Sequence, residues 1–186
     1  MGQLEDEQDW IRQSRDGNPE AFAALVARYQ HMVHSLTFRM TGSLADAEDL
    51  AQETFLLAFR RLDSFRGESK FSSWLYQIAV NTCLNWKKSR MRRNESHQDW
   101  ADHERIFGGQ CAAMSPEDEE NTRRVQEALL KLPPKQRAAI VLTVYEGMNH
   151  AEAARTLGCA ETTVSWRLFA GRAKLKRLLK TKMRHD

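Results

Sequence analysis

The sequence is poor in the residues that mark disulfide-rich, metal-binding and membrane-spanning proteins. Its 186 residues include 3 cysteines, 4 prolines and 9 glycines. The cysteines, Cys83, Cys111 and Cys159, are odd in number and far apart, which excludes a disulfide framework and a CxxC zinc knuckle. No apolar run approaches the roughly 18–20 residues that cross a bilayer. The first 20 residues, with Glu5, Asp6, Glu7 and Asp9, carry the wrong charge for a signal or transit peptide. We therefore expect a reduced, soluble, cytoplasmic protein.

Strand signals are also lacking, because no stretch alternates polar and apolar residues with β-branched side chains. The N-terminal half instead contains capping residues and apolar spacings that are typical of helices. Asn18-Pro19 forms a cap with a first-turn proline, and Ser43 begins a second helix. We expect helices over 19–40, 43–62 and 72–92. In the second of these, the inward face is expected to carry Leu50, Ala51, Phe55, Ala58, Phe59 and Leu62.

The C-terminal half has its own helix signals. Ser115-Pro116 precedes a run of carboxylates, which are favourable near the positive end of a helix dipole. Further helices are expected over 135–145, 149–157 and 161–180. The fold class predicted is therefore all-α, with two small helical domains over 1–93 and 115–186. Residues 94–114 lack a consistent period and are predicted to form a flexible linker.

The net charge of +3 conceals a strong separation of charge along the chain. The net charges of residues 1–53, 54–93, 94–120 and 121–186 are −6, +7, −7 and +9. Two basic blocks separated by an acidic one indicate two surfaces that contact a polyanion. Charge alone does not distinguish DNA, RNA and an acidic protein, and solvated helix faces also produce such blocks.

The last two expected helices have the spacing of a helix-turn-helix. A small residue at Ala154, a turn glycine at Gly158 and an apolar plug at Val164 suit two helices that cross closely. The second helix is expected to present polar and aromatic side chains to the major groove and basic ones to phosphates. These candidates are Thr162, Thr163, Ser165, Trp166, Arg167, Phe169, Arg172 and Lys174.

Residues 65–93 mix aromatic and basic side chains. Single-stranded nucleic acid suits such a mixture, because bases stack on aromatic rings while cations follow the backbone. A glycine-containing loop before a helix can also hold an extruded base. Aromatic side chains at helical spacing are equally typical of a core, and this alternative stays open for Phe65 and Trp86 in particular.

Taken together, the residues resemble a family, the extracytoplasmic-function (ECF) subfamily of sigma-70-type RNA polymerase sigma factors. DAEDLAQETFLLAFRRLDSFRGESKFSSWLYQIAVNTCLNWKKSRMRR (46–93) looks like their region 2. LKLPPKQRAAIVLTVYEGMNHAEAARTLGCAETTVSWRLFAGRAKLKRLL (130–179) looks like their region 4. The resemblance covers both halves in order, leaving mainly the linker and about 15 N-terminal residues unmatched.

The resemblance implies a protein that is not an enzyme, has no cofactor and binds core RNA polymerase, promoter DNA and an anti-sigma factor. It implies polymerase contacts at Asp46, Asp49, Gln52, Glu53 and Arg60. Melting of the −10 element would use Phe65, Arg66, Lys70, Phe71, Trp74, Tyr76, Asn81, Lys87 and Arg90. The helix from Glu161 would read the −35 element. Ser165 and Ala170 stand where many relatives carry arginine, which can bond to guanine. The resemblance therefore does not predict which −35 DNA sequence this chain reads.

The sequence also raises two alternative interpretations, a metal site and a different DNA-binding function. His97, His103 and Cys111 in the linker match no recognised metal-ligand spacing, and we predict no metal site. A conventional helix-turn-helix repressor or activator is the main alternative function. Such a protein would bind duplex DNA without core polymerase.

Overall fold

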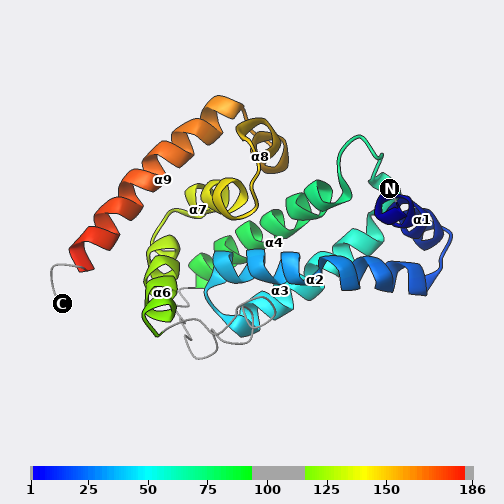
Figure 1. Cartoon of the computed structure of the whole chain (residues 1–186), viewed down its shortest axis with the longest axis horizontal. Coiled ribbons are helices and arrows are strands. Elements are labelled where there is room, and N and C mark those ends of the chain that lie inside the picture. Colours follow the sequence, from blue (N-terminus) through cyan, green and yellow to red (C-terminus); the bar gives the residue numbers. More distant parts are fainter. Residues whose placement is uncertain (1, 94–115, 183–186) are drawn as a thin grey trace.

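The structure, a computed structural model, describes residues 2–93 and 116–182, and within them the side chains of 6–90 and 117–180. In these parts of the chain all regular elements are helical, as the sequence predicted. The N-terminal half contains α1 (Gly2–Arg15), α2 (Pro19–Thr41), α3 (Leu44–Arg60), a short 3₁₀ turn (Leu62–Ser64) and α4 (Phe71–Arg93). The C-terminal half contains α6 (Pro116–Leu130), α7 (Pro134–Ile140), a π-helical turn (Val141–Tyr145), α8 (His150–Leu157) and α9 (Glu161–Lys182). Figure 1 shows α1–α4 as one bundle, with α6–α9 lying against one side of it.

Local capping explains where several helices begin and end. The Asn18 side chain accepts hydrogen bonds from the backbone N–H groups of Glu20 and Ala21, and Ser43 accepts one from Asp46. Asn149 and Glu152 form a reciprocal capping box at the start of α8. These bonds satisfy amides that would otherwise have no partner, so the helix boundaries lie close to the predicted ones.

Helix α1 was missed by the sequence analysis. Its buried side chains are Glu7, Ile11 and Ser14, at helical spacing. Since two of these three are polar, the apolar period that identifies an amphipathic helix is weak here. The basic residues Arg12 and Arg15 in the last turn were the available signal, because cations there complement the helix dipole.

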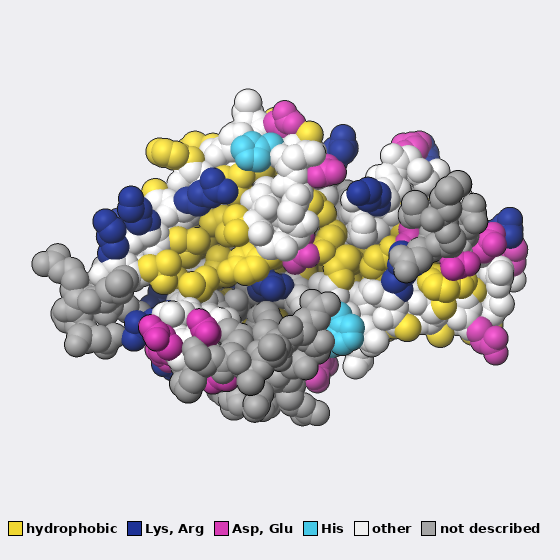
Figure 2. Space-filling model, in the orientation of Figure 1, with side chains coloured by type: hydrophobic (Ala, Val, Ile, Leu, Met, Phe, Trp, Pro, Cys, Tyr) yellow, Lys and Arg dark blue, Asp and Glu magenta, His cyan; other side chains and the backbone are white. Residues whose placement is uncertain are grey.

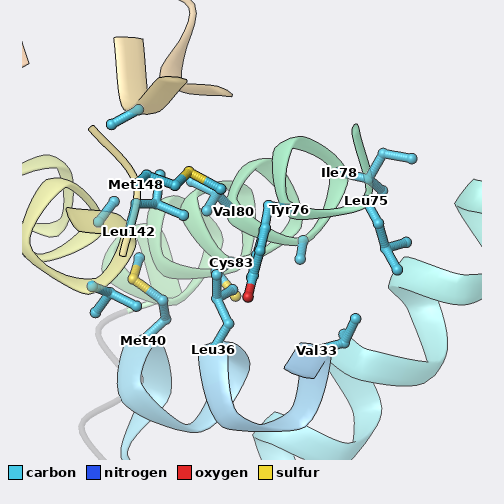
Figure 3. Close-up of a cluster of buried hydrophobic side chains, with 14 of the residues drawn as sticks. Val33, Leu36, Met40, Leu75, Tyr76, Ile78, Val80, Cys83, Leu142 and Met148 are labelled. Carbon is cyan, nitrogen blue, oxygen red and sulfur yellow. The ribbon is translucent and has the colours of Figure 1, made fainter. Parts of the chain in front are cut away.

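One hydrophobic core runs through both halves of the molecule. Figure 3 shows Leu36 and Met40 of α2 beneath Val80 and Cys83 of α4, with side chains of the C-terminal half beside Val80. Those side chains are Leu142, from the π-helical turn, and Met148, which precedes α8. The same face of α4 therefore serves as core for both halves.

Polar groups reinforce this contact at the C-terminal end of α2. The Gln126 side chain of α6 donates to the carbonyl of Phe38 at 3.0 Å, and Arg137 of α7 donates to the carbonyl of Met40. Gly42 closes α2 with φ +76°, and a β-carbon there would lie 2.2 Å from Leu130 of α6. Only glycine combines that backbone conformation with so close an approach.

Candidate polymerase and nucleic-acid interfaces

The exposed face of α3 combines charged, amide and apolar side chains. Of the predicted polymerase contacts, Asp49, Gln52, Glu53 and Arg60 are exposed. Asp46 is half-buried and forms an ion pair with Arg90 of α4 at 2.8 Å, so it stabilises the bundle. Asp46, a candidate for polymerase binding, is thus paired with Arg90, a candidate for binding the −10 element.

Two large apolar side chains lie on the same face and were not recognised as a surface. Leu56 is 58% exposed and Phe59 is 50% exposed. Phe59 was expected to face the core, but its ring packs edge-on against Phe22 of α2 with half its surface in solvent. Residues 49, 52, 53, 56, 59 and 60 recur at spacings of three and four and form one stripe. Below we call this stripe the α3 face.

The loop between the 3₁₀ turn and α4 presents cations above a cluster of aromatic rings. Arg66 and Lys70 are exposed. Phe65 and Phe71 are buried and pack with Trp74, each pair having ring centroids 5.4 Å apart. Trp74 is half-buried. Phe65 and Phe71 therefore do not offer their rings to a strand in this structure; they support Trp74 and the loop from beneath.

Arg15 of α1 holds this loop in place, and sequence reasoning gave it no role. Its guanidinium donates to the carbonyl of Leu62, with Nε and Nη2 each at 3.3 Å, and to the carbonyl of Phe65. The Leu62 carbonyl lies at the start of the 3₁₀ turn and the Phe65 carbonyl at the start of the loop that follows it. Nothing in the sequence pattern signals the contact, because it joins residues 47 and 50 positions apart.

The other candidates on α4 occupy different faces of the helix. Asn81 is exposed, whereas Lys87 and Arg90 are half-buried. Burial and the nearby charges of Arg137 and Arg90 lower the pKa of Lys87. The Arg90 guanidinium lies 5.0 Å from the centre of the Trp86 ring.

Tyr76 is buried between the two halves and does not face solvent. Its hydroxyl donates to the Glu146 carboxylate, which also lies 3.7 Å from the Arg39 guanidinium. Burial, followed by the bond to Glu146, raises the pKa of Tyr76. In this arrangement Tyr76 joins the halves, so a nucleic-acid strand does not reach it. The strand contact expected at Tyr76 is therefore inaccessible while the two halves are joined in this way.

Helices α8 and α9 have the geometry expected of a helix-turn-helix. Gly158 closes α8 in the left-handed conformation with φ +57°, and the Cys159 N–H donates to the Ala154 carbonyl at 3.0 Å. Ala154 and Val164 are buried where the two helices cross. The three positions identified from sequence therefore have the roles predicted for them.

The outer side of α9 carries several of the predicted −35 contacts. Thr162, Ser165, Trp166, Phe169 and Arg172 are exposed, whereas Thr163, Arg167 and Lys174 are half-buried. Figure 2 shows Lys and Arg side chains along α9 with hydrophobic side chains beside them. The helix has the combination of basic and apolar groups that a DNA major groove accommodates.

No helix in the described residues is long and apolar enough to cross a membrane. Nor do these residues contain a cluster of three or more histidine, cysteine or carboxylate side chains able to hold a metal ion. The linker candidates His97, His103 and Cys111 lie outside the described residues. Cys83 is buried, and burial raises the pKa of its thiol to about 12.

Comparisons with known proteins match both halves of the chain. Residues 25–93 match the family model Sigma-70 region 2, and residues 122–175 match Sigma-70, region 4. The RNA polymerase sigma-H factor of Pseudomonas aeruginosa is 32% identical over 187 residues, covering 97% of each chain. The ECF RNA polymerase sigma-E factor of Escherichia coli is 39% identical over 169 residues, covering 87% of this chain and 88% of the relative.

Solved structures resemble the whole fold. CnrH in complex with the cytosolic domain of CnrY superimposes with a TM-score of 0.68 at 27% identity, covering 95% of this chain and 98% of CnrH. The sigma factor RpoE of Bartonella quintana, in complex with the anti-sigma factor NepR, gives a TM-score of 0.69 at 26% identity. That match covers 86% of this chain and 96% of RpoE.

Proposed function

Since the chain belongs to the extracytoplasmic-function (ECF) group of sigma-70 factors, we propose that it binds core RNA polymerase and directs it to promoters. The observation that carries this conclusion is the presence of both sigma regions, in order, in one chain. It acts by binding and has no catalytic centre of its own. Its place of action is the cytoplasm, where core polymerase and the chromosome are found.

Each region has a separate task in this proposal. Residues 1–93 form the domain that docks on polymerase through the α3 face and opens the −10 element. Residues 115–186 form the domain that reads the −35 element, and residues 94–114 connect the two. Arg66, Lys70, Trp74 and Asn81 are the −10 contacts that the surface of the N-terminal half makes available, and Lys87 and Arg90 are half-buried further along α4.

The contact between the halves bears on regulation. Tyr76 and the adjoining face of α4 are covered by the C-terminal half. We propose that the halves separate when the protein binds polymerase and that an anti-sigma protein opposes this step. This partner is supported by the similarity to RpoE, whose solved structure contains an anti-sigma factor.

Run-off transcription tests the function directly. Purified core polymerase is combined with the chain and a promoter library, and RNA synthesis is compared with reactions that lack either protein. We expect initiation only when both are present. A folded protein that stimulates no promoter with active core rules the proposal out. Protection of duplex DNA by the chain alone favours the repressor or activator alternative.

Arg15→Ala tests whether α1 positions the −10 loop. The variant loses the bonds to Leu62 and Phe65. Since a hydrogen bond from a charged donor contributes about 1.5–3 kcal/mol, we expect promoter opening to slow by about tenfold or more. Permanganate reactivity of unpaired thymines measures the opening, and a filter or fluorescence assay measures polymerase binding, which should stay within about twofold.

The matched control is Arg12→Ala on the same helix. The Arg12 side chain is 71% exposed, and its ion pair is with Asp9, one turn away. It should open promoters at the normal rate. Arg15→Lys should restore part of the rate, because lysine keeps the charge but cannot donate in two directions from a fixed plane. An equal loss in polymerase binding would mean that Arg15 only maintains the bundle.

A further inference from the structure

Two aromatic side chains dominate the outward surface of the first turns of α9. Trp166 is 62% exposed and Phe169 is 76% exposed. They lie three positions apart and therefore project from one side of the helix. Large exposed aromatic side chains need an explanation, since contiguous exposed apolar surface marks an interaction site.

Two of the polar side chains beside them, Ser165 and Arg167, have partners within the protein. The Ser165 hydroxyl donates to the Glu161 carbonyl at 3.1 Å and lies 3.0 Å from Nδ1 of His150 in α8. Arg167 is half-buried and donates to the sulfur of Cys159 at 3.4 Å. Beyond Phe169, the next exposed arginine on α9 is Arg172. The first two turns thus offer apolar contact more readily than bidentate hydrogen bonds.

The charge around the aromatic pair indicates an anionic partner. After Glu161, α9 contains no acidic residue, while its later turns carry Arg172, Lys174, Lys176, Arg177 and Lys180. A protein surface that buried the two rings would have to be strongly acidic beside them. Duplex DNA supplies phosphates for the basic turns and base edges for the first turns of the helix.

The major groove displays one apolar group, the C5-methyl of thymine. Trp166 and Phe169 can contact such methyls but cannot make the bidentate bonds that arginine makes with guanine. Three residues of helix rise about 4.5 Å, which is close to the roughly 3.4 Å between base pairs. The two rings therefore match neighbouring base pairs.

We propose that Trp166 and Phe169 read the thymine methyl groups of two neighbouring A·T pairs in the upstream promoter element. The inference rests on the proposed sigma function and adds the base that this chain recognises. It predicts an upstream element that differs from those read through arginine at position 165 or 170, where this chain has serine and alanine.

The test uses holoenzyme assembled from core polymerase and the full chain. Upstream elements are selected from a randomised library, and each thymine of the selected sequence is then replaced by deoxyuridine, which removes only the methyl. Since one buried methyl group changes affinity by about fourfold, we expect about a fourfold loss at each of two positions and about 15-fold for both. Deoxyuridine in the spacer between the promoter elements should have no effect.

Protein variants connect the loss to these two rings. Holoenzyme carrying Trp166→Ala and Phe169→Ala should bind thymine and deoxyuridine elements equally. The matched control, Val144→Ala, removes another exposed apolar side chain, which is 54% exposed, and should keep the full sensitivity to deoxyuridine.

The outcomes separate this inference from the proposed function. Holoenzyme that initiates normally but ignores deoxyuridine, or that selects guanine at the contacted positions, overturns the assignment and leaves the sigma function intact. If the double variant instead abolishes self-association of the chain with no effect on DNA, the patch is a protein interface and the inference is wrong. Failure of the chain to support initiation at every promoter contradicts the proposed function itself.

Discussion

Leu56→Glu on the α3 face should lower the affinity for core polymerase by about 100-fold. The α3 face is the only exposed stripe that we assign to polymerase, and it places Leu56 and Phe59 among charged and amide side chains. Apolar anchors at the centre of an interface each contribute about 2 kcal/mol or more when they are buried by the partner. A carboxylate at position 56 would remove that contribution and add the cost of desolvating a charge.

The fold should tolerate this change, because Leu56 is 58% exposed. Circular dichroism and a thermal midpoint within about 2 °C of the parent would establish that the variant is folded. Binding is measured by fluorescence anisotropy of the labelled chain with core polymerase. A substitution at Phe59 would also change the stability of the fold, since the Phe59 ring packs against Phe22.

Ala27→Glu is the matched control. It places the same charge on an exposed residue of α2 that is not part of the α3 face. We expect its affinity for polymerase to be within about twofold of the parent. If Leu56→Glu binds polymerase as tightly as Ala27→Glu does, the polymerase surface lies elsewhere on the molecule.

Arg137→Ala should cost about 3 kcal/mol or more of folding free energy. Arg137 is 2% exposed, and its guanidinium donates to the carbonyls of Leu129, Leu130 and Leu132 and across to Met40. Alanine would remove the guanidinium donor from all four carbonyls. The Leu129 carbonyl would keep its bond from the Leu132 N–H, and each buried carbonyl left unsatisfied costs about 1–3 kcal/mol. The same burial lowers the pKa of Arg137 to about 10, since desolvation penalises its charged form.

Urea unfolding measures this loss, with Arg123→Ala as the control. Arg123 is half-exposed and forms ion pairs within α6, so its replacement should cost about 0.5 kcal/mol or less. Gln126→Ala removes a single bond between the halves and should fall between the two variants, at about 1 kcal/mol. An Arg137 variant as stable as the Arg123 variant would show that other groups or water satisfy the four carbonyls.

Much of the helical framework could be predicted because its causes are local. Asn18, Ser43 and Asn149 cap helices within three residues of themselves, and Gly158 closes α8 with a left-handed backbone conformation. Helix α1 escaped prediction because its buried stripe includes Glu7 and Ser14 and so lacks an apolar period.

The candidate sites could be predicted only in part. The sequence identified Trp166 and Phe169 as candidate contacts, and the structure places both on the surface. It gave Phe59 the wrong face. It also named Phe71 and Tyr76 as strand contacts, although both are buried here, and left a core role open for Phe65. Helical period alone does not say how wide the buried face is, since that width depends on which helices pack against it.

By itself, the sequence determined an all-α chain with two sigma regions, a helix-turn-helix and separated blocks of charge. The all-α character, the helix-turn-helix and the charge blocks follow from residue spacing and composition, and the two sigma regions follow from a resemblance to a known family. Neither kind of inference needs knowledge of distant contacts. Only the tertiary structure decided that Arg15 holds the loop before α4, that Tyr76 meets Glu146, and that Arg137 bonds to Met40. These pairs are 50, 70 and 97 positions apart, and bonds over such distances form only once packing has brought their helices together.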